Sequence, residues 1–384
     1  MTLMQRPTAA PSTAPQGIAL RRIAIIAHSG AHVWRLRGGL VAGLRARRHG
    51  VKCFAHDYGQ RDSAGLDALG VERAMLPPPS PGVQLFAERR SIISLAEQLS
   101  AFRPHCVLIS GGQIGLQAAK AARKARVEQI VTLVNEVPSH ARGDATLRGL
   151  ARTLELTDVA VFHNADDPKT LRRSGMLPAD LAYVVVPGAG VDLARYGTQP
   201  LPALADGLVF LMIARLDTAK GVLDYCEAAR IVKARAPSAR FLLAGPPGDR
   251  RTRLSVKDIA AFAECVTYLG ELDDVREALA RCHVYVYPSH NEGMPRSVLE
   301  AMAAGRPVIT TDVPGCRDTV DERINGCLVP PSDPAALAAA METFLKRPDL
   351  IPSIARASRA KAERRFDERA VNETLMGVMG IGEG

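Results

Sequence analysis

The sequence lacks any apolar run that approaches the roughly 18 residues a helix needs to cross a bilayer. Aromatic residues make up only 4% of the 384 residues, and no stretch interleaves them with lysine or arginine, as a stacking surface for single-stranded nucleic acid would. The seven cysteines are scattered, with no C-x-x-C pair. We therefore expect reduced, mostly buried thiols in a cytosol, with neither a metal site nor a disulfide framework.

Acidic residues are absent from the first 50 positions, which contain eight arginines. Residues 1–190 carry a net charge of +10, whereas the rest of the chain carries −1. This asymmetry indicates an anionic partner of the N-terminal half, such as nucleic acid, a membrane surface or a phosphorylated substrate. Residues 1–20 are rich in Pro, Ala, Thr and Gln, and we expect a loose tail there and no signal peptide.

Strand-like and helix-like segments alternate in two successive series, which predicts two parallel α/β domains. A chain of 384 residues is long enough for two full cores. The expected strands are 22–27, 51–55, 105–110, 130–134, 159–164 and 183–192 in the first series, and 208–214, 240–245, 265–270, 283–288 and 306–311 in the second. We expect one domain over 21–190 and the other over 191–364. The glycines of PGAGVD (187–192) could absorb a hinge between the two domains.

The stretch RCHVYVYPSHNEGMPRSVLEAMAAGRPVITT (281–311) predicts a strand, a loop, a helix and a second strand. Pro295 suits the first position of the helix, because its missing N–H costs nothing there. Val298 and Met302 belong to an apolar face at helical spacing, and Gly305 is placed to end the helix. The free N–H groups and the dipole of such a helix start favour an anion.

Two carboxylates flank this predicted anion site: Glu292 in the loop and Glu300 in the helix, with seven residues between them. The helical part of this separation covers only roughly 7.5 Å of axis, so the pair could bracket one elongated ligand with a phosphate in its middle. The spacing alone is equally compatible with a solvated Glu300 and an ordinary loop residue at 292.

The full run NEGMPRSVLEAMAAGRPVITTDVPG resembles the donor-sugar motif of the retaining glycosyltransferases of family 4, which have the GT-B fold. The resemblance implies two Rossmann-like domains that face a central cleft, and a last helix within 365–384 that packs back on the first domain. It implies that Glu300 binds the ribose hydroxyls of a nucleotide-diphosphate sugar and that Glu292 binds the sugar hydroxyls. The further donor contacts we expect in this motif are Gly293, Met294, Pro295 and Val298.

A second group of candidate residues lies in ARLDTAKG (214–221), where Arg215 follows a predicted strand and Lys220 precedes a helix. Two cations at a strand end can hold a diphosphate, although such residues are more often simply solvated. The family carries its diphosphate-binding pair in the same R-L-x-x-x-K-G pattern. We also expect Gly270 and Glu271 at the nucleotide base, as the resemblance implies, and Gly30 at the donor.

The acceptor side departs from the family pattern. Many members carry a histidine after the strand that reads IVTLV here, whereas this chain has Asn135 and Glu136, and its nearest histidine is His140. Asn135 could donate a hydrogen bond to the sugar, but asparagine at a strand end usually starts a turn. Further candidates for this side are His28, His32 and His163. We expect Arg35, Arg37, Trp34, Arg89 and Arg90 at a face directed toward the acceptor and an anionic membrane.

These observations lead to the hypothesis of a metal-independent retaining glycosyltransferase that needs no cofactor. It would move a sugar from a UDP-hexose or UDP-N-acetylhexosamine to a lipid-linked or polysaccharide acceptor in bacterial cell-surface glycan synthesis. Arg215, Lys220 and the helix start would neutralise the leaving diphosphate, and Glu292 could alternatively act as a covalent nucleophile. We expect a cytoplasmic enzyme, peripheral to the inner face of the membrane, with no nucleic-acid partner. A nucleotide-sugar epimerase of the same fold and a basic nucleic-acid-binding protein are the alternatives.

Overall fold

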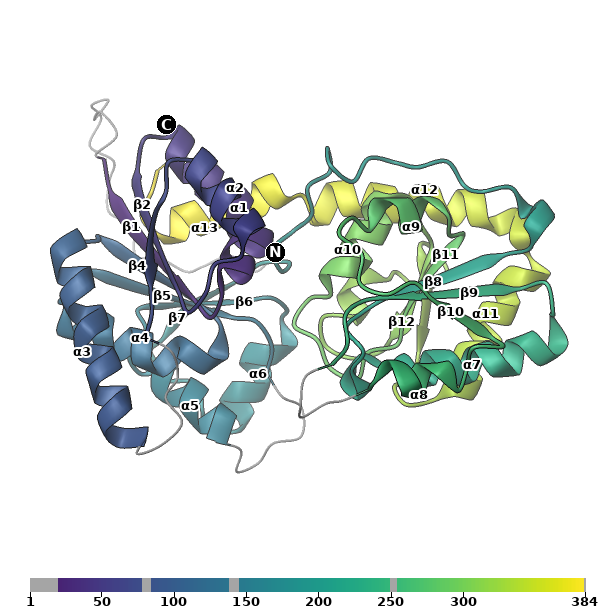
Figure 1. Cartoon of the computed structure of the whole chain (residues 1–384), viewed down its shortest axis with the longest axis horizontal. Helices are drawn as coiled ribbons and strands as arrows, with labels where there is room; N and C mark the ends of the chain where they lie inside the picture. The colour runs from purple at the N-terminus through teal and green to yellow at the C-terminus, as the bar shows by residue number, and fades with distance from the viewer. Residues whose placement is uncertain (1–19, 78–83, 138–144, 249–253, 383–384) are drawn as a thin grey trace.

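The computed structural model describes residues 20–77, 84–137, 145–248 and 254–382. Within these ranges the chain forms two units side by side, each built around a parallel β-sheet covered by helices (Figure 1). The α/β class with two Rossmann-like domains is thereby confirmed. The expected N-terminal tail, apart from Leu20, and His140 lie outside the described residues.

The N-terminal sheet has the strand order β3-β2-β1-β4-β5-β6-β7, and all neighbouring strands are parallel. Its strands are β1 (Arg22–Ala27), β2 (Gly50–Ala55), β3 (Glu72–Met75), β4 (Cys106–Ser110), β5 (Gln129–Val134), β6 (Val159–Phe162) and β7 (Ala182–Val185). The helices of this half are α1 (Gly30–Ala46), α2 (Gln60–Ala68), α3 (Gln84–Phe102), α4 (Gly112–Lys124), α5 (Ala145–Leu154) and α6 (Asp166–Arg173).

The C-terminal sheet has the order β10-β9-β8-β11-β12-β13 and is also parallel. Its strands are β8 (Val209–Ile213), β9 (Arg240–Ala244), β10 (Val266–Tyr268), β11 (Val284–Tyr287), β12 (Val308–Thr311) and β13 (Gly326–Val329). The helices that follow β8 are α7 (Val222–Arg235), α8 (Val256–Ala260), α9 (Arg276–Ala280), α10 (Arg296–Ala303), α11 (Pro334–Lys346), α12 (Ile351–Arg365) and α13 (Glu368–Val378). Short 3₁₀ turns are η1 (Leu204–Asp206), η2 (Thr218–Lys220), η3 (Arg317–Thr319) and η4 (Pro348–Leu350).

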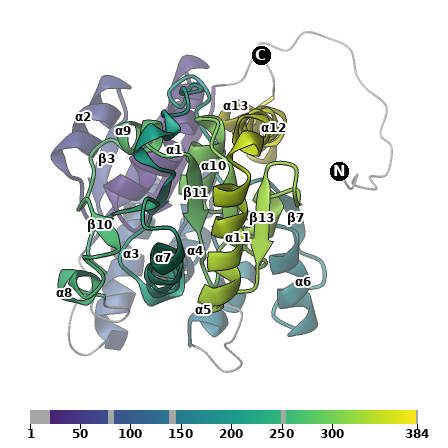
Figure 2. The ribbon, with the colours of Figure 1, turned by 90° about the vertical axis from the view of Figure 1, so that its right-hand side faces the viewer.

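The hydrophobic cores divide the chain between Val186 and Val191. Three buried clusters surround the N-terminal sheet, and one large cluster that begins with Val191 surrounds the C-terminal sheet. The last helix, α13, belongs to the N-terminal side, because Val371, Leu375 and Met376 are buried in the cluster around β1 and α1. It continues from α12 across the junction of the two units, and Figures 1 and 2 show α12 and α13 end to end along one edge of the molecule.

The site is positioned by the strand order of the two sheets. In each sheet the strands are added first on one side of the first strand and then on its other side. The direction changes between β1 and β4 in the N-terminal sheet and between β8 and β11 in the C-terminal sheet. In parallel α/β sheets, ligands bind outside the carboxyl ends of the strands at such a reversal. The loops after β1, β8 and β11 therefore meet at the junction of the two units.

The predicted strands all occur, most of them within two residues of their expected ends. The exception is 183–192, where β7 already ends at Val185. The start of α10 was less accurate, because Pro295 is the N-cap of this helix and not its first helical residue. Gly305 ends α10 as expected, with a left-handed φ of 74° just after the C-cap.

Candidate active site

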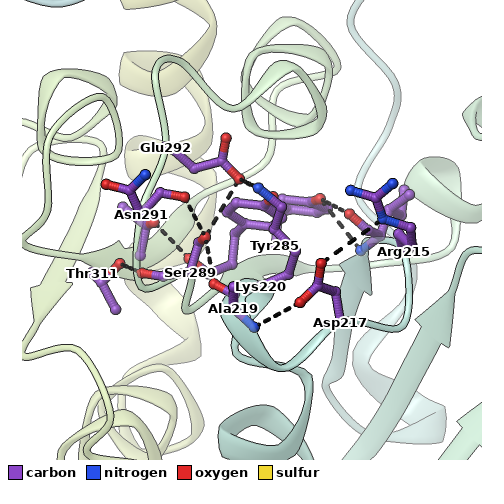
Figure 3. A network of polar contacts seen from close by, with 12 residues as sticks. Arg215, Asp217, Ala219, Lys220, Tyr285, Ser289, Asn291, Glu292 and Thr311 are labelled. Atoms are coloured by element: carbon purple, nitrogen blue, oxygen red, sulfur yellow. Dashed lines mark hydrogen bonds and ion pairs between the residues drawn. The ribbon is translucent and has the colours of Figure 1, made fainter. Parts of the chain in front are cut away.

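Glu292 is a fixed carboxylate in the loop between β11 and α10. Its Oε1 accepts hydrogen bonds from Lys220 Nζ and the Tyr287 hydroxyl, both at 2.6 Å, and from Ser289 Oγ at 3.4 Å. Burial and the neighbouring Glu292 raise the pKa of Tyr287, which is therefore a neutral donor. Because these donors converge on one oxygen, the other oxygen of Glu292 points away from the network (Figure 3).

Lys220 is held in place by the turn that precedes α7. Gly221 adopts a left-handed φ of 71°, and a Cβ there would lie 1.9 Å from the carbonyl oxygen of Pro288, so only glycine fits between η2 and the end of β11. Burial by itself lowers the pKa of Lys220, but Glu292 and Glu136 outweigh this effect, and the pKa is raised. The Lys220–Glu292 pair is thus a preformed ion pair.

Arg215 lies two residues after the end of β8, and its side chain is more exposed than that of Lys220. Its side chain is 50% exposed, and its Nε lies 3.9 Å from Asp217 Oδ2. Asp217 in turn caps η2 by accepting a hydrogen bond from the Ala219 N–H at 2.9 Å. Arg215 and Lys220 therefore belong to one network, as Figure 3 shows, and the guanidinium is available to a ligand.

Glu300 lines a cavity of about 880 Å³ between the two units. It is 8% exposed, and Arg296 Nε donates to its Oε1 at 2.9 Å. Ser297, at the start of α10, also lines this cavity. From the N-terminal side the walls include Arg35 and Arg61, and Arg61 pairs with Asp273 of the opposite unit at 3.1 Å.

Four expected donor residues are placed differently from their predictions. The walls of the large cavity include Leu272 and Val275 but not Gly270 or Glu271, so the loop after β10 reaches the cavity two residues later than expected. The Val298 side chain is fully buried in the C-terminal core, where it cannot touch a ligand. Gly30 packs against the Tyr58 ring and donates its N–H to Asp57, while its neighbours Ser29 and Ala31 line the cavity.

A second cavity, of about 140 Å³, adjoins the first, since Leu36 and Arg296 line both. Its other walls include Glu292, Gly293, Met294, Asn135 and Glu136, which are the residues expected around the sugar and the acceptor. The two units touch here, because a Cβ on Gly293 would lie 1.4 Å from the backbone oxygen of Asn135. Asn164 reinforces the contact by donating to the backbone oxygen of Gly293 at 2.9 Å.

The expected basic face is only partly correct. Arg37 is 1% exposed and lines the small cavity, so it cannot contact a membrane. Trp34 is half-buried, its ring contacts Gly65 of α2, and it lines the large cavity. Arg35 is exposed at the large cavity. Arg89 and Arg90 are exposed on α3, the outermost helix of the N-terminal unit in Figure 1.

The described residues lack two features, a metal-binding cluster and a membrane-spanning helix. They contain no group of three or more His, Cys, Asp or Glu side chains arranged to hold a metal ion. In the same ranges, no helix is both long and apolar enough to cross a bilayer. All seven cysteines are free thiols, five of them buried, as their scattered positions suggested.

Comparison with known families covers both units. Residues 33–188 match the family described as Glycosyl transferase 4-like domain, and residues 207–347 match Glycosyl transferases group 1. The chain belongs to the family 4 type of glycosyltransferases.

Individual relatives of this glycosyltransferase are found among bacterial proteins. It is 31% identical over 207 residues to the putative colanic acid biosynthesis glycosyltransferase WcaL of Escherichia coli, a match that covers 51% of this chain and 50% of WcaL. It is 23% identical over 380 residues to an N,N'-diacetylbacillosaminyl-diphospho-undecaprenol alpha-1,3-N-acetylgalactosaminyltransferase of Campylobacter jejuni, with 92% and 97% covered. The chain thus spans about half the length of WcaL but nearly all of the second relative.

Solved structures show the same fold. The Anabaena protein Alr3699/HepE in complex with UDP-glucose superposes with a TM-score of 0.78 at 18% identity, covering 94% of this chain and 99% of that one. The GT-B architecture of this glycosyltransferase is thereby confirmed.

Several residues of the glycosyltransferase site were not singled out from the sequence. Tyr287 fixes Glu292, Arg296 pairs with Glu300, and Asn164 joins the two units. The signal for Arg296 was present, because it lies four residues before Glu300, the spacing at which helix side chains meet. Asn164 had no local signal, since its partner lies in the other unit.

Proposed function

We propose that this chain is a metal-independent retaining glycosyltransferase that transfers a sugar from a nucleotide-diphosphate donor to a lipid-linked or polysaccharide acceptor in bacterial cell-surface glycan synthesis. The observation that carries the proposal is the arrangement of the two carboxylates. Glu300 lines the large cavity and Glu292 the small one, and the start of α10 lies where the two cavities adjoin. One donor can therefore extend through both.

The proposed donor places its nucleoside in the large cavity, where Glu300 accepts hydrogen bonds from the ribose hydroxyls. Its diphosphate lies between the N-terminus of α10 and the cations Arg215 and Lys220. Its sugar enters the small cavity, where the free oxygen of Glu292 accepts from a sugar hydroxyl. Asn135 and Glu136 close this cavity from the side on which the acceptor arrives.

Catalysis would depend on stabilising the negative charge that develops on the leaving diphosphate. Arg215 and the remaining N–H groups of Lys220 would stabilise that charge, and such stabilisation is usually the largest single contribution to catalysis. The acceptor hydroxyl would attack the anomeric carbon from the face that the diphosphate vacates and would give its proton to a phosphate oxygen. Glu292 is less suited to act as a covalent nucleophile, because Lys220 and Tyr287 already bind one of its oxygens.

A UDP-linked hexose or N-acetylhexosamine is the donor we propose. It is supported by the Anabaena complex with UDP-glucose and by the Campylobacter relative, whose name includes an N-acetylgalactosaminyl group and a diphospho-undecaprenol acceptor. A cytoplasmic location at the inner face of the membrane is supported by the +10 charge of residues 1–190 and by the exposed Arg89 and Arg90.

The proposal is tested by incubating the protein with a panel of nucleotide sugars, with EDTA, and with or without a diphosphate-linked lipid glycan. We expect one UDP-sugar to bind, to hydrolyse slowly alone, and to transfer its sugar when the lipid is added. Isomerisation of the donor sugar without release of UDP would indicate the epimerase. Failure of every nucleotide sugar to bind would contradict both activities.

A further inference from the structure

Arg37 is a buried arginine that forms no ion pair within the described residues. It lies in α1 with an exposure of 1%, and its Nη2 is 3.3 Å from His163 Nε2. Its Nε and Nη1 are also buried, and neither has a hydrogen-bond partner in the described part of the chain. Its guanidinium therefore lacks most of the partners that it can take.

The charge on this guanidinium persists despite its burial. Burial lowers the pKa of Arg37 to about 10, Glu368 raises it, and Arg296 lowers it, so the side chain is a cation at neutral pH. Burial lowers the pKa of His163 to about 3, which makes this imidazole a neutral acceptor for Nη2. A buried cation that contacts no carboxylate destabilises the folded protein, because its lost hydration is not fully replaced. Such an arrangement is expected where a ligand supplies the anion.

The position of Arg37 indicates which part of the substrate carries that anion. Arg37 lines the small cavity together with Glu292 and Asn135, and the Oδ1 of Asn135 is a second buried atom without a partner in the described residues. Arg215 and Lys220, the proposed diphosphate ligands, line neither cavity, whereas Glu292, the proposed sugar ligand, lines the small cavity together with Arg37. An anion that meets Arg37 in this cavity would therefore belong to the group in the sugar subsite.

We propose that the transferred sugar is a hexuronic acid, whose carboxylate is the counter-ion of Arg37. This inference rests on the proposed glycosyltransferase function and narrows its donor from hexoses in general to UDP-linked uronates. The unpartnered nitrogens of Arg37 donate to the carboxylate, and Glu292 accepts from a hydroxyl of the same ring. The buried site then discriminates against a neutral hexose, because the neutral sugar leaves the cation unpaired.

The test compares the binding of UDP-glucuronate, UDP-galacturonate, UDP-glucose and UDP by titration calorimetry. The full chain is used as wild type, Arg37→Met and Arg47→Met. Arg47 lies on the same helix and pairs at the surface with Glu373, outside both cavities, so its variant controls for the loss of one positive charge. We expect the wild type to bind one uronate about tenfold or more tighter than UDP-glucose, as a charged hydrogen bond allows.

In Arg37→Met the preference should disappear while the affinity for UDP stays unchanged, and Arg47→Met should keep the preference. The ligand-free Arg37→Met protein should melt at or above the wild-type temperature, because an unpaired buried charge is replaced by an apolar side chain. If the methionine variant does not fold, Arg37→Gln provides the same comparison.

Equal affinity of the wild type for uronate and glucose donors, or a preference that survives in Arg37→Met, would overturn the proposal. Loss of geranyl diphosphate binding in Arg37→Met, without any uronate preference in the wild type, would assign Arg37 to the acceptor diphosphate and would also overturn it. Failure of the wild type to bind even UDP would instead overturn the proposed glycosyltransferase function.

Discussion

The cleft has two faces, one formed by the N-terminal unit and the other by the C-terminal unit. The buried polar groups of the two faces find their partners in different ways. On the C-terminal face the charges are paired within the protein, Lys220 with Glu292 and Arg296 with Glu300. On the N-terminal face Arg37 has no ion pair in the described residues, and burial lowers the pKa of the neighbouring His32 to about 4. The C-terminal face is therefore built before the ligand arrives, whereas we propose that the N-terminal face is completed by it. Substitutions on the first face should remove turnover or nucleotide binding, and those on the second should change selectivity.

The largest effect is expected for Glu292→Ala. Turnover should fall by about 10²-fold or more, as for other groups that act on the transition state, while free UDP still binds. The substitution also leaves Lys220 without its carboxylate partner, so the thermal stability should fall. The double variant Glu292→Ala/Lys220→Met should recover stability but not turnover. Near-normal rates in the single variant would show that Glu292 on the C-terminal face does not contribute to catalysis.

Compared with Glu292→Ala, the variant Glu300→Ala should have a smaller effect on turnover and a larger effect on UDP binding. Loss of two ribose hydrogen bonds should weaken UDP binding by about 10²-fold or more, because each bond to a charged group contributes about 1.5–3 kcal/mol. The rate at saturating donor should change much less. Titration calorimetry with UDP measures the first quantity and initial rates measure the second. Unchanged affinity for UDP would place the ribose elsewhere.

Arg215 and Lys220 should show a strongly non-additive effect on the rate, because both would stabilise the same diphosphate. Lys220→Ala should cost more than Arg215→Ala, since Lys220 also orients Glu292 whereas Arg215 is half exposed. Rates of the two single variants and the double variant, measured with EDTA present, test this. Simple additivity, or activity that stops with EDTA, would argue against a shared diphosphate site.

The smallest effect concerns the outer surface of the N-terminal unit. We expect the protein to bind anionic vesicles at low salt and to dissociate as the salt rises through ~0.05–0.5 M, where screening becomes effective. Reversing Arg89 and Arg90 to Glu should weaken this binding without changing UDP affinity, since each basic residue contributes ~1 kcal/mol near an anionic surface.

The matched control for this surface is the reversal of Arg172 and Arg173, an exposed pair on α6. If both double variants weaken vesicle binding equally, net charge and not the α3 surface is responsible. A protein that ignores anionic vesicles at low salt and glycosylates a soluble neutral acceptor efficiently would contradict the membrane proposal.

The same contrast between the faces explains what the sequence could predict. Strands were identified well, because the interiors of both sheets are short apolar runs such as RIAIIA and VYVY. Elements without that pattern were missed, among them the exposed edge strand β3, which reads ERAM. Glu292 and Glu300 were found because strand, loop and helix lie in one continuous stretch. The N-terminal face is assembled from α1 and the ends of β5 and β6, so no continuous motif identifies it.

Arg37 shows how the prediction for that face failed and what could have corrected it. Arg35 and Arg37 were expected to share an exposed surface, yet residues two positions apart on a helix point in very different directions, at about 100° of rotation per residue. Arg37 lies four residues after Val33 and three before Leu40, and both of these are buried. The helical period therefore placed Arg37 on the buried face, where an arginine is unusual enough to indicate a ligand.

The most direct test of the account is the anomeric configuration of the sugar first released from the donor. The UDP-linked α-sugar that binds best is incubated with the protein and EDTA in the absence of acceptor, and the product is followed by proton NMR before mutarotation. Retention with the diphosphate held on the C-terminal face predicts that the α-anomer appears first and that Glu292→Ala slows its release by about 10²-fold or more. Initial release of the β-anomer would contradict the account.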